Sequence, residues 1–175
     1  IAGNVSFYNE SKNGAIPPSP IVSCLGKLKD VSRAVPMCFQ SPGSVLLMIG
    51  ERKNELGGSV YYSLFNELGF NVPKPDFQEV KNQIFALTDC VDRELILSCH
   101  DIADGGLASA LAEMTFGNGV GCNVKTEIDL SVDRILFSET GGFVVEVLSK
   151  NIDSVKTLFA NYGLAVFNIG NTDGD

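Results

Sequence analysis

The segment from Val45 to Ile49 is an uninterrupted apolar run, VLLMI, bounded by Gly43 and Gly50. A run of this length between two glycines is typical of a β-strand that is buried on both faces. A strand of this kind lies inside a layered fold, with further structure packed against each of its two sides. The remaining pattern therefore has to supply both layers.

Several later segments supply helices for these layers. Val60, Tyr61, Leu64, Phe65 and Leu68 recur at helical spacing, so we predict a helix over 59–68 with Gly69 placed to cap its end. Asp76 is a good N-cap for a second, longer helix that ends near Arg93. An Ala-rich helix through Met114 and a helix that starts at Asn151 are predicted further along the chain.

Extended segments alternate with these helices. We predict strands at 21–27, 95–99, 120–124, 143–148 and 165–169, in addition to 45–49, and a polar turn or short helix at 129–133. Strands and helices in this order indicate an α/β fold, an α+β layered sandwich in which a mixed β-sheet is packed with helices. Residues 1–20 are polar and end in the proline-rich IPPSP, which favours an extended connector.

The charge balance excludes whole classes of partner. The chain has 175 residues with 13 Lys and Arg against 21 Asp and Glu, a formal charge of −8. Proteins that hold nucleic acid or an anionic membrane surface by bulk electrostatics need a basic footprint, so we expect neither partner. No apolar run approaches the 18 residues of a spanning helix, and we expect a soluble, cytoplasmic protein. Because the chain begins at Ile1 inside a strand-like segment, we expect it to be part of a longer protein.

Cysteine and histidine usage argues against common metal and nucleophile sites. The five cysteines include no CxxC pair, and Cys24, Cys99 and Cys122 lie in apolar runs, which favours reduced core thiols. His100 is the single histidine of the chain. Neither a Cys-His-Asn set with a spare base nor a zinc site with several histidines can therefore be built from this chain alone.

One turn has the features of an anion site. Ser98 to Leu107 ends a strand, passes through Gly105 and Gly106 and opens a helix, which exposes backbone N–H groups next to Asp101 and Asp104. Asp101 could ligate Mg²⁺, which takes one or two carboxylates together with substrate phosphates. The alternative is structural: Asp104 acts as an N-cap, the two glycines allow close packing, and His100 is a hydrogen-bonded structural residue.

Three other glycine-containing segments carry weaker signals. Gly117 to Gly121 spells GxGxG, but it follows a helix and precedes a strand, the reverse of a dinucleotide fingerprint. Gly50 to Ser59 lacks the lysine that a phosphate loop places directly before Ser or Thr. The run FSETGGF, Phe137 to Phe143, could hold a ribose or a phosphate, or could form a hairpin turn.

Five segments in this order resemble the C-terminal part of the phosphoribosylformylglycinamidine synthase (FGAM synthase) family. They are GNVSFYNES at 3–11, PPSPIV at 17–22, IGERKNELGGSVYY at 49–62, HDIADGGLASALAEM at 100–114 and LFSETGGFVVEV at 136–147. The resemblance implies that 1–20 end a preceding dimerising domain and its connector. It also implies that 21–175 form the C-terminal α/β domain related to aminoimidazole ribonucleotide (AIR) synthase.

The resemblance implies an ATP-dependent carbon–nitrogen ligase of de novo purine biosynthesis. Formylglycinamide ribonucleotide, a small-molecule substrate, would react with ATP and glutamine-derived ammonia, with Mg²⁺ as cofactor. The implied partners are the preceding domains of the same synthetase, a glutaminase component that supplies ammonia, and a small accessory subunit. Because the family's catalytic histidine and ribonucleotide-binding loop precede this segment, the chain alone is expected to be inactive.

Site residues transfer through the GNVS motif. The resemblance implies that Gly3 contacts ATP, Asn4 is a Mg²⁺ ligand and Ser6 contacts substrate. It also implies a second, quasi-equivalent nucleotide site, which would be lined by Asp101, Asp104, Ser138 and Glu139. Here the family's usual FSESPGRF is altered at Thr140 and Gly142, and the arginine of that motif, a bidentate phosphate donor, is missing.

Two alternatives stay open at this point. The chain could be a noncatalytic scaffold that carries a pseudo-nucleotide site. It could also belong to a sister ATP-dependent synthetase of the same superfamily, such as AIR synthase or selenophosphate synthetase, which share the His-Asp and Gly-Gly turn.

Overall fold

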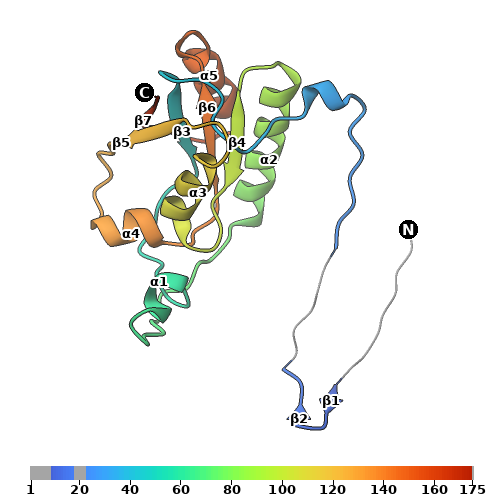
Figure 1. Ribbon diagram of the computed structural model, residues 1–175, viewed down its shortest axis with the longest axis vertical. Coiled ribbons are helices and arrows are strands. Elements are labelled where there is room, and N and C mark those ends of the chain that lie inside the picture. Colours follow the sequence, from blue (N-terminus) through green and yellow to red (C-terminus); the bar gives the residue numbers. More distant parts are fainter. Residues whose placement is uncertain (1–8, 18–22, 175) are drawn as a thin grey trace.

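The computed structural model describes residues 9–17 and 23–174 (Figure 1). Two antiparallel sheets are present in this part of the chain, a two-stranded hairpin and a five-stranded sheet that forms the body of the domain. The strands are β1 (Glu10–Ser11), β2 (Gly14–Ala15), β3 (Val45–Ile49), β4 (Ser98–Asp101), β5 (Gly121–Val124), β6 (Phe143–Val147) and β7 (Val166–Asp173). The helices are η1 (Val31–Arg33), α1 (Val60–Ser63), α2 (Phe77–Asp92), α3 (Gly106–Met114), α4 (Val132–Phe137), η2 (Ser149–Asn151) and α5 (Ile152–Asn161).

The layered α/β class is confirmed, but the expected mixed sheet is wrong. The strand order is β4-β6-β3-β7-β5, and each of the four neighbouring pairs is antiparallel. Strands β3, β4 and β5 all run in one direction, as helical crossover connections require. The later strands β6 and β7 insert between them in the opposite direction. A crossover helix therefore links strands that are parallel but not adjacent, which the order of elements along the chain does not reveal.

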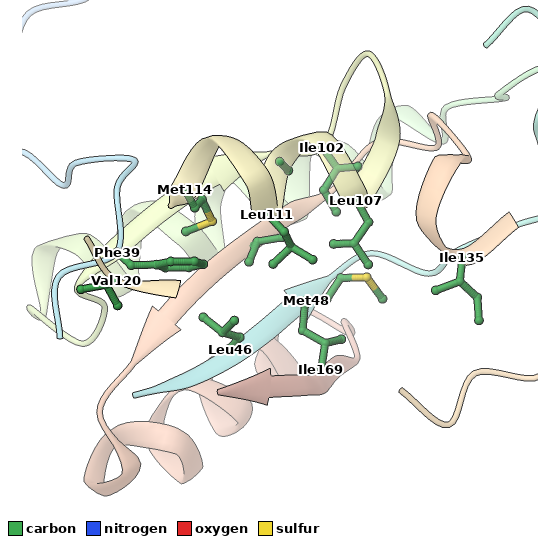
Figure 2. Close-up of a cluster of buried hydrophobic side chains, with 12 residues drawn as sticks. Phe39, Leu46, Met48, Ile102, Leu107, Leu111, Met114, Val120, Ile135 and Ile169 are labelled. Atoms are coloured by element: carbon green, nitrogen blue, oxygen red, sulfur yellow. The ribbon is translucent and has the colours of Figure 1, made fainter. Parts of the chain in front are cut away.

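The central strand β3 is buried on both faces, as its apolar run predicts. Leu46 and Met48 point toward Leu107 and Leu111 of α3 (Figure 2), in a cluster that also includes Ile135 of α4. The alternate residues Val45, Leu47 and Ile49 belong to a second cluster on the other face of the sheet, with side chains of α2 and α5. Because side chains alternate along a strand, one five-residue run anchors both helical layers.

The helix ends follow local chemistry where the sequence has a cap. The Asp76 side chain accepts hydrogen bonds from the backbone N–H groups of Gln78 and Glu79, which confirms it as the N-cap of α2. Asn151 precedes α5 as predicted, but its side chain does not cap that helix. Its Nδ2 instead donates to the carbonyl oxygen of Leu95, 3.2 Å away.

Three predicted elements differ from the structure. The helix expected over 59–68 is short, because α1 ends at Ser63 and the chain continues in turns. The strand expected at 21–27 is absent from residues 23–27, and residues 21 and 22 lie outside the described part. The polar turn expected near 129–133 leads into α4. The proposed domain boundary between residues 20 and 21 also lies outside the described part, so it stays a prediction.

The N-terminal segment lies apart from this body. Figure 1 shows the β1–β2 hairpin well away from the five-stranded sheet, and η1 lies between residue 23 and β3. No helix in the described residues combines the length and hydropathy that a membrane crossing needs.

The cysteine thiols are predicted to differ strongly in reactivity. Cys24 is exposed, contrary to its expected place in a strand, whereas burial raises the pKa of Cys99 to about 12 and that of Cys90 to about 11. At pH 8, we expect iodoacetamide to modify Cys24 at least about tenfold faster than Cys90 or Cys99, because the thiolate is the nucleophile. Peptide mass spectrometry measures this, and urea-unfolded protein, in which the rates should converge, is the control. Equal rates in the folded protein would contradict the packing described.

The same thiols make stability depend on pH. In the unfolded chain the thiols of Cys90 and Cys99 ionise near their ordinary pKa of 9.0, whereas in the folded protein they stay protonated to higher pH. The unfolded state therefore binds fewer protons above pH 9, and the free energy of unfolding falls as pH rises from about 9 toward 11–12. Below pH 8 these two groups contribute no slope.

Candidate functional site

The features with chemical potential gather at one end of the five-stranded sheet. The register aligns Asp101 with Phe143, Phe143 with Ile49, and Ile49 with Val166. Strands β3 and β4 therefore end where β6 and β7 begin. The connection that follows β3, the Gly-Gly turn that follows β4, and the 138–141 loop that precedes β6 all lie at this end of the sheet.

The 138–141 loop is held by the connection between β3 and α1. Arg52 donates from Nη1 to the carbonyl oxygen of Ser138 (3.3 Å) and from Nη2 to that of Gly141 (2.6 Å). The Ser138 hydroxyl donates to the carbonyl oxygen of Glu55 (3.3 Å), and the Thr140 hydroxyl donates to Glu55 Oε2 (2.8 Å). The two segments that contain the motifs GERKNELGGS and FSETGG are thus fastened to each other.

Arg52 is a buried cation with few compensating contacts. Arg52 is only 5% exposed, and its Nε has no hydrogen-bond partner. The guanidinium forms no ion pair with an acidic residue in the described part of the chain. Desolvation lowers the pKa of its guanidinium to about 10, and the nearby charge of Glu55 opposes this shift. Two carbonyl oxygens are therefore the groups that hold this charge at the base of the loop.

Glu139 occupies one backbone donor of the turn that the sequence predicted for an anion, the N–H of Gly105, and also a donor outside that turn, the N–H of Val60. Its Oε1 accepts hydrogen bonds from the N–H of Val60 (2.8 Å) and from the N–H of Gly105 (2.9 Å). The prediction of an anion-friendly turn is thus supported in its chemistry, because a carboxylate is held there. The anion is a side chain of the protein itself. It ties the start of α1 to the turn before α3.

The Gly-Gly turn has the predicted strand–turn–helix form. Gly105 and Gly106 have φ values of 77° and 68°, in the left-handed region that favours glycine. A Cβ on Gly106 would lie 2.6 Å from the carbonyl oxygen of Leu136, so the close-packing role is confirmed. The N-cap of α3 is Gly105 and no side chain caps this helix, so Asp104 does not have the capping role considered above.

Asp101 and Asp104 are both exposed, and Asp101 Oδ1 lies 3.5 Å from Nδ1 of His100. His100 Nδ1 lies 2.7 Å from the carbonyl oxygen of Asp101, and its Nε2 lies 2.9 Å from Glu113 Oε2. Each ring nitrogen of His100 therefore has an oxygen partner within hydrogen-bond distance. His100 thus matches its structural alternative, a satisfied histidine that links β4 to α3.

The four residues of the predicted second nucleotide site fall into two pairs. Ser138 and Glu139 adjoin the Gly105 turn, but the Ser138 hydroxyl and one oxygen of Glu139 already have partners within the protein. Asp101 and Asp104 present exposed carboxylates, which suit Mg²⁺. Within residues 9–17 and 23–174, no three His, Cys, Asp or Glu side chains converge as a metal site. A Mg²⁺ ion here would take its other ligands from phosphate, water or residues elsewhere.

Gly3, Asn4 and Ser6 lie outside the described residues, so the roles implied for them stay predictions. Sequence reasoning missed Arg52 and Glu55, because the 50–59 segment was weighed only as a phosphate loop. It also missed a groove of about 940 Å³ between the 125–130 connection and β7, which Arg52 borders. One sequence signal could have identified Arg52. It lies in the 49–62 motif, which occurs together with the 136–147 motif that contains FSETGG in the family this sequence resembles.

Comparison with known proteins agrees with this architecture. Residues 41–175 match the family described as AIR synthase related protein, C-terminal domain. The phosphoribosylformylglycinamidine synthase subunit PurL of Methanothrix thermoacetophila is 40% identical over 173 residues, which are 97% of this chain and 22% of that protein. The same subunit of Thermobifida fusca is 38% identical over 177 residues, covering 98% of this chain and 23% of that protein.

A solved structure, T. maritima PurL complexed with FGAR, has a TM-score of 0.72 to this chain at 18% identity, covering 82% of this chain and 26% of that one. This similarity shows the fold. The chain spans about a quarter of the length of the curated relatives it matches. The match over residues 41–175 takes in most of the chain, the whole five-stranded sheet and every contact of the 138–141 loop described above. The chain therefore belongs to the family of AIR synthase related proteins, C-terminal domain.

Proposed function

We propose that the chain is the C-terminal portion of a phosphoribosylformylglycinamidine synthase. The whole enzyme would convert formylglycinamide ribonucleotide, ATP and glutamine-derived ammonia to formylglycinamidine ribonucleotide, ADP and phosphate. The observation that carries this proposal is the 40% identity to a PurL subunit across 97% of the chain. Structures of T. maritima PurL complexed with ATP and with FGAR support the substrate class.

The chain's own contribution to that reaction would come from its N-terminal motif. Gly3 would let the backbone approach ATP, Asn4 would offer an amide oxygen to Mg²⁺, and the Ser6 hydroxyl would hydrogen-bond to the ribonucleotide. ATP supplies the phosphoryl group that activates the amide oxygen of the substrate. The chain would form one edge of the active site, and the isolated chain would be inactive. The whole enzyme would work in the cytoplasm.

The partners would be the preceding domains of the same synthetase, a glutaminase component and a small accessory subunit. A structure of PurLQS from T. maritima supports an assembly of this kind. Ammonia, a small neutral molecule, would reach the synthetase from the glutaminase within such a complex.

A second candidate function is a noncatalytic scaffold with a pseudo-nucleotide site at Asp101, Asp104, Ser138 and Glu139. The observation in its favour is that Glu139 already fills the N–H pair of Val60 and Gly105. Phosphate would have to displace this carboxylate, so the remaining contribution to the binding of Mg²⁺-ADP would come from the exposed carboxylates of Asp101 and Asp104.

The decisive measurement is the turnover of an Asn4→Ala variant of the intact synthetase. We expect kcat to fall by about 10²-fold or more, the size found when one contact to developing charge is removed. The assay follows formylglycinamidine ribonucleotide formation from ammonia, ATP and Mg²⁺. The 175-residue chain alone should form no product under the same conditions.

Two variants complete the test. Asn13→Ala, at an exposed position in the turn between β1 and β2, is the matched control and should leave kcat unchanged. Asp101→Asn should leave kcat unchanged if its site is not catalytic, and a loss equal to that of Asn4→Ala would instead place catalysis at the Gly-Gly turn. Full activity of Asn4→Ala would overturn the catalytic role proposed for this chain.

A further inference from the structure

The segment from Gly57 to Val72 exposes a group of large apolar side chains. Leu64 is 73% exposed, Phe65 60% and Leu68 77%, and Phe70 is fully exposed. We call these four residues the α1 patch. Figure 1 shows that α1 and the turns after it project from the body of the domain, away from the helices that cover the sheet. The apolar face predicted for the 59–68 helix therefore has no core to cover among the described residues.

The α1 patch stands on a fixed support. Within the segment, the N–H of Gly57 donates to the carbonyl oxygen of Asn71 (2.8 Å), and the N–H of Gly58 donates to that of Leu68 (2.7 Å). The Tyr61 ring stacks on the Phe137 ring with centroids 4.5 Å apart and planes 1° apart. Glu139 holds the N–H of Val60 at 2.8 Å. The side chains are thus presented by a constrained segment that is anchored to the candidate site.

The composition of this segment is that of a buried surface. Between residues 57 and 72 a single side chain, Glu67, carries a charge. Surface segments of soluble proteins are normally charged, and contiguous exposed apolar groups of this size mark interaction sites. Such a surface fits a partner that is itself apolar and uncharged, with no requirement for an opposite charge.

We propose that the α1 patch docks against another part of the same polypeptide, outside the 175 residues described by this sequence. This inference rests on the proposed function, since it requires a longer synthetase. Two observations support that occupant. An alignment over 97% of this chain covers only 22% of the PurL relative. The rest of that relative is therefore more than three times as long as the aligned part. The net charge of −8 also disfavours a second copy of this chain, because two like-charged bodies would repel.

The test measures solvent access at Phe70 in the isolated chain and in the intact synthetase. In Phe70→Cys, maleimide labelling followed by peptide mass spectrometry should be at least tenfold slower in the intact synthetase than in the isolated chain. Lys156→Cys, at an exposed position on α5, is the control and should be labelled at similar rates in both. Hydrogen exchange of residues 60–72 in the unsubstituted proteins gives the same comparison without any variant.

Three outcomes would overturn the proposal. Equal labelling of Phe70→Cys in both proteins means that the patch stays open in the synthetase. Slow labelling in the isolated chain that depends on its concentration means that a second copy covers the patch. Slow labelling there at every concentration means that the chain's own terminal residues cover it. Turnover of the same synthetase is assayed separately, so a protein that lacks the proposed activity can still show the docking.

Discussion

Replacing Glu146 by alanine is expected to lower the free energy of unfolding by about 3–5 kcal/mol, because its hydrogen-bond donors lose their acceptor and a cavity opens in the core. Glu146 lies in the middle of β6 and is completely buried. Its Oε2 accepts hydrogen bonds from the N–H of Gln40 and the hydroxyl of Ser98, both at 2.8 Å, and its Oε1 accepts from the N–H of Ser41 at 2.9 Å.

This carboxylate joins three parts of the chain that are far apart in sequence. Glu146 faces the α3 side of the sheet, since its neighbours Val145 and Val147 belong to the cluster on the α2 and α5 side. Removing its side chain leaves the buried Ser98 hydroxyl without an acceptor and takes the same acceptor from the N–H groups of Gln40 and Ser41, which are only partly buried. It also opens a cavity between the 40–41 segment and β4. A buried donor left unsatisfied costs about 1–3 kcal/mol, and the cavity adds to this loss.

Urea unfolding of Glu146→Ala and Glu146→Gln separates the lost contacts from the lost volume. Glutamine keeps the volume and one acceptor oxygen, so it should cost less than alanine. Glu127→Ala, at an exposed carboxylate, is the control for removing a negative charge and should change stability by less than about 0.5 kcal/mol. A loss below about 1 kcal/mol for Glu146→Ala would contradict the buried network.

Gly106→Ala is expected to destabilise the protein by about 3 kcal/mol, through backbone strain and a steric clash together. The φ of Gly106 is 68°, and its added Cβ would lie 2.6 Å from the carbonyl oxygen of Leu136 and 2.9 Å from two backbone atoms of Phe137. Backbone cannot move aside as a flexible side chain can. The end of α4 would have to shift, and Gly105 would shift with it relative to Glu139.

Gly119→Ala is a closely matched control for this substitution. Gly119 has nearly the same φ, 67°, but a Cβ there would meet no atom within 4 Å. Its cost should be that of the left-handed conformation alone, about 1–2 kcal/mol. Thermal or urea unfolding of both variants measures the difference. If the two substitutions cost the same, the close approach of the Gly-Gly turn to α4 does not contribute to stability.

Helices and strands could be predicted from the sequence where the residues that specify them are close together in the chain. The VLLMI run of β3 is flanked by glycines, and Asp76 stands directly before an apolar face with helical spacing, so both elements form as expected. The turn through Gly105 and Gly106 was also predictable, because two left-handed residues in succession require glycine there. Each of these signals is complete within a few consecutive residues.

The 59–68 helix shows where this reasoning fails. Its apolar spacing is that of a core-facing helix, yet α1 ends at Ser63 and Leu64 and Leu68 face outward. Periodicity reports that a face is apolar and says nothing of which surface covers it. Within the described residues Leu64 and Leu68 stay exposed, and the apolar spacing alone did not extend the helix beyond Ser63.

The layered α/β class, the doubly buried central strand, the Gly-Gly turn and the family could be predicted from residue types at fixed short spacings. Long-range packing was needed to establish that β6 and β7 enter between earlier strands, that Arg52 holds the 138–141 loop, and that Glu139 accepts from the N–H groups of Val60 and Gly105. The physical reason is distance along the chain. Glu139 and Val60 are brought together by the sheet, and no local pattern encodes a hydrogen bond between residues 79 positions apart.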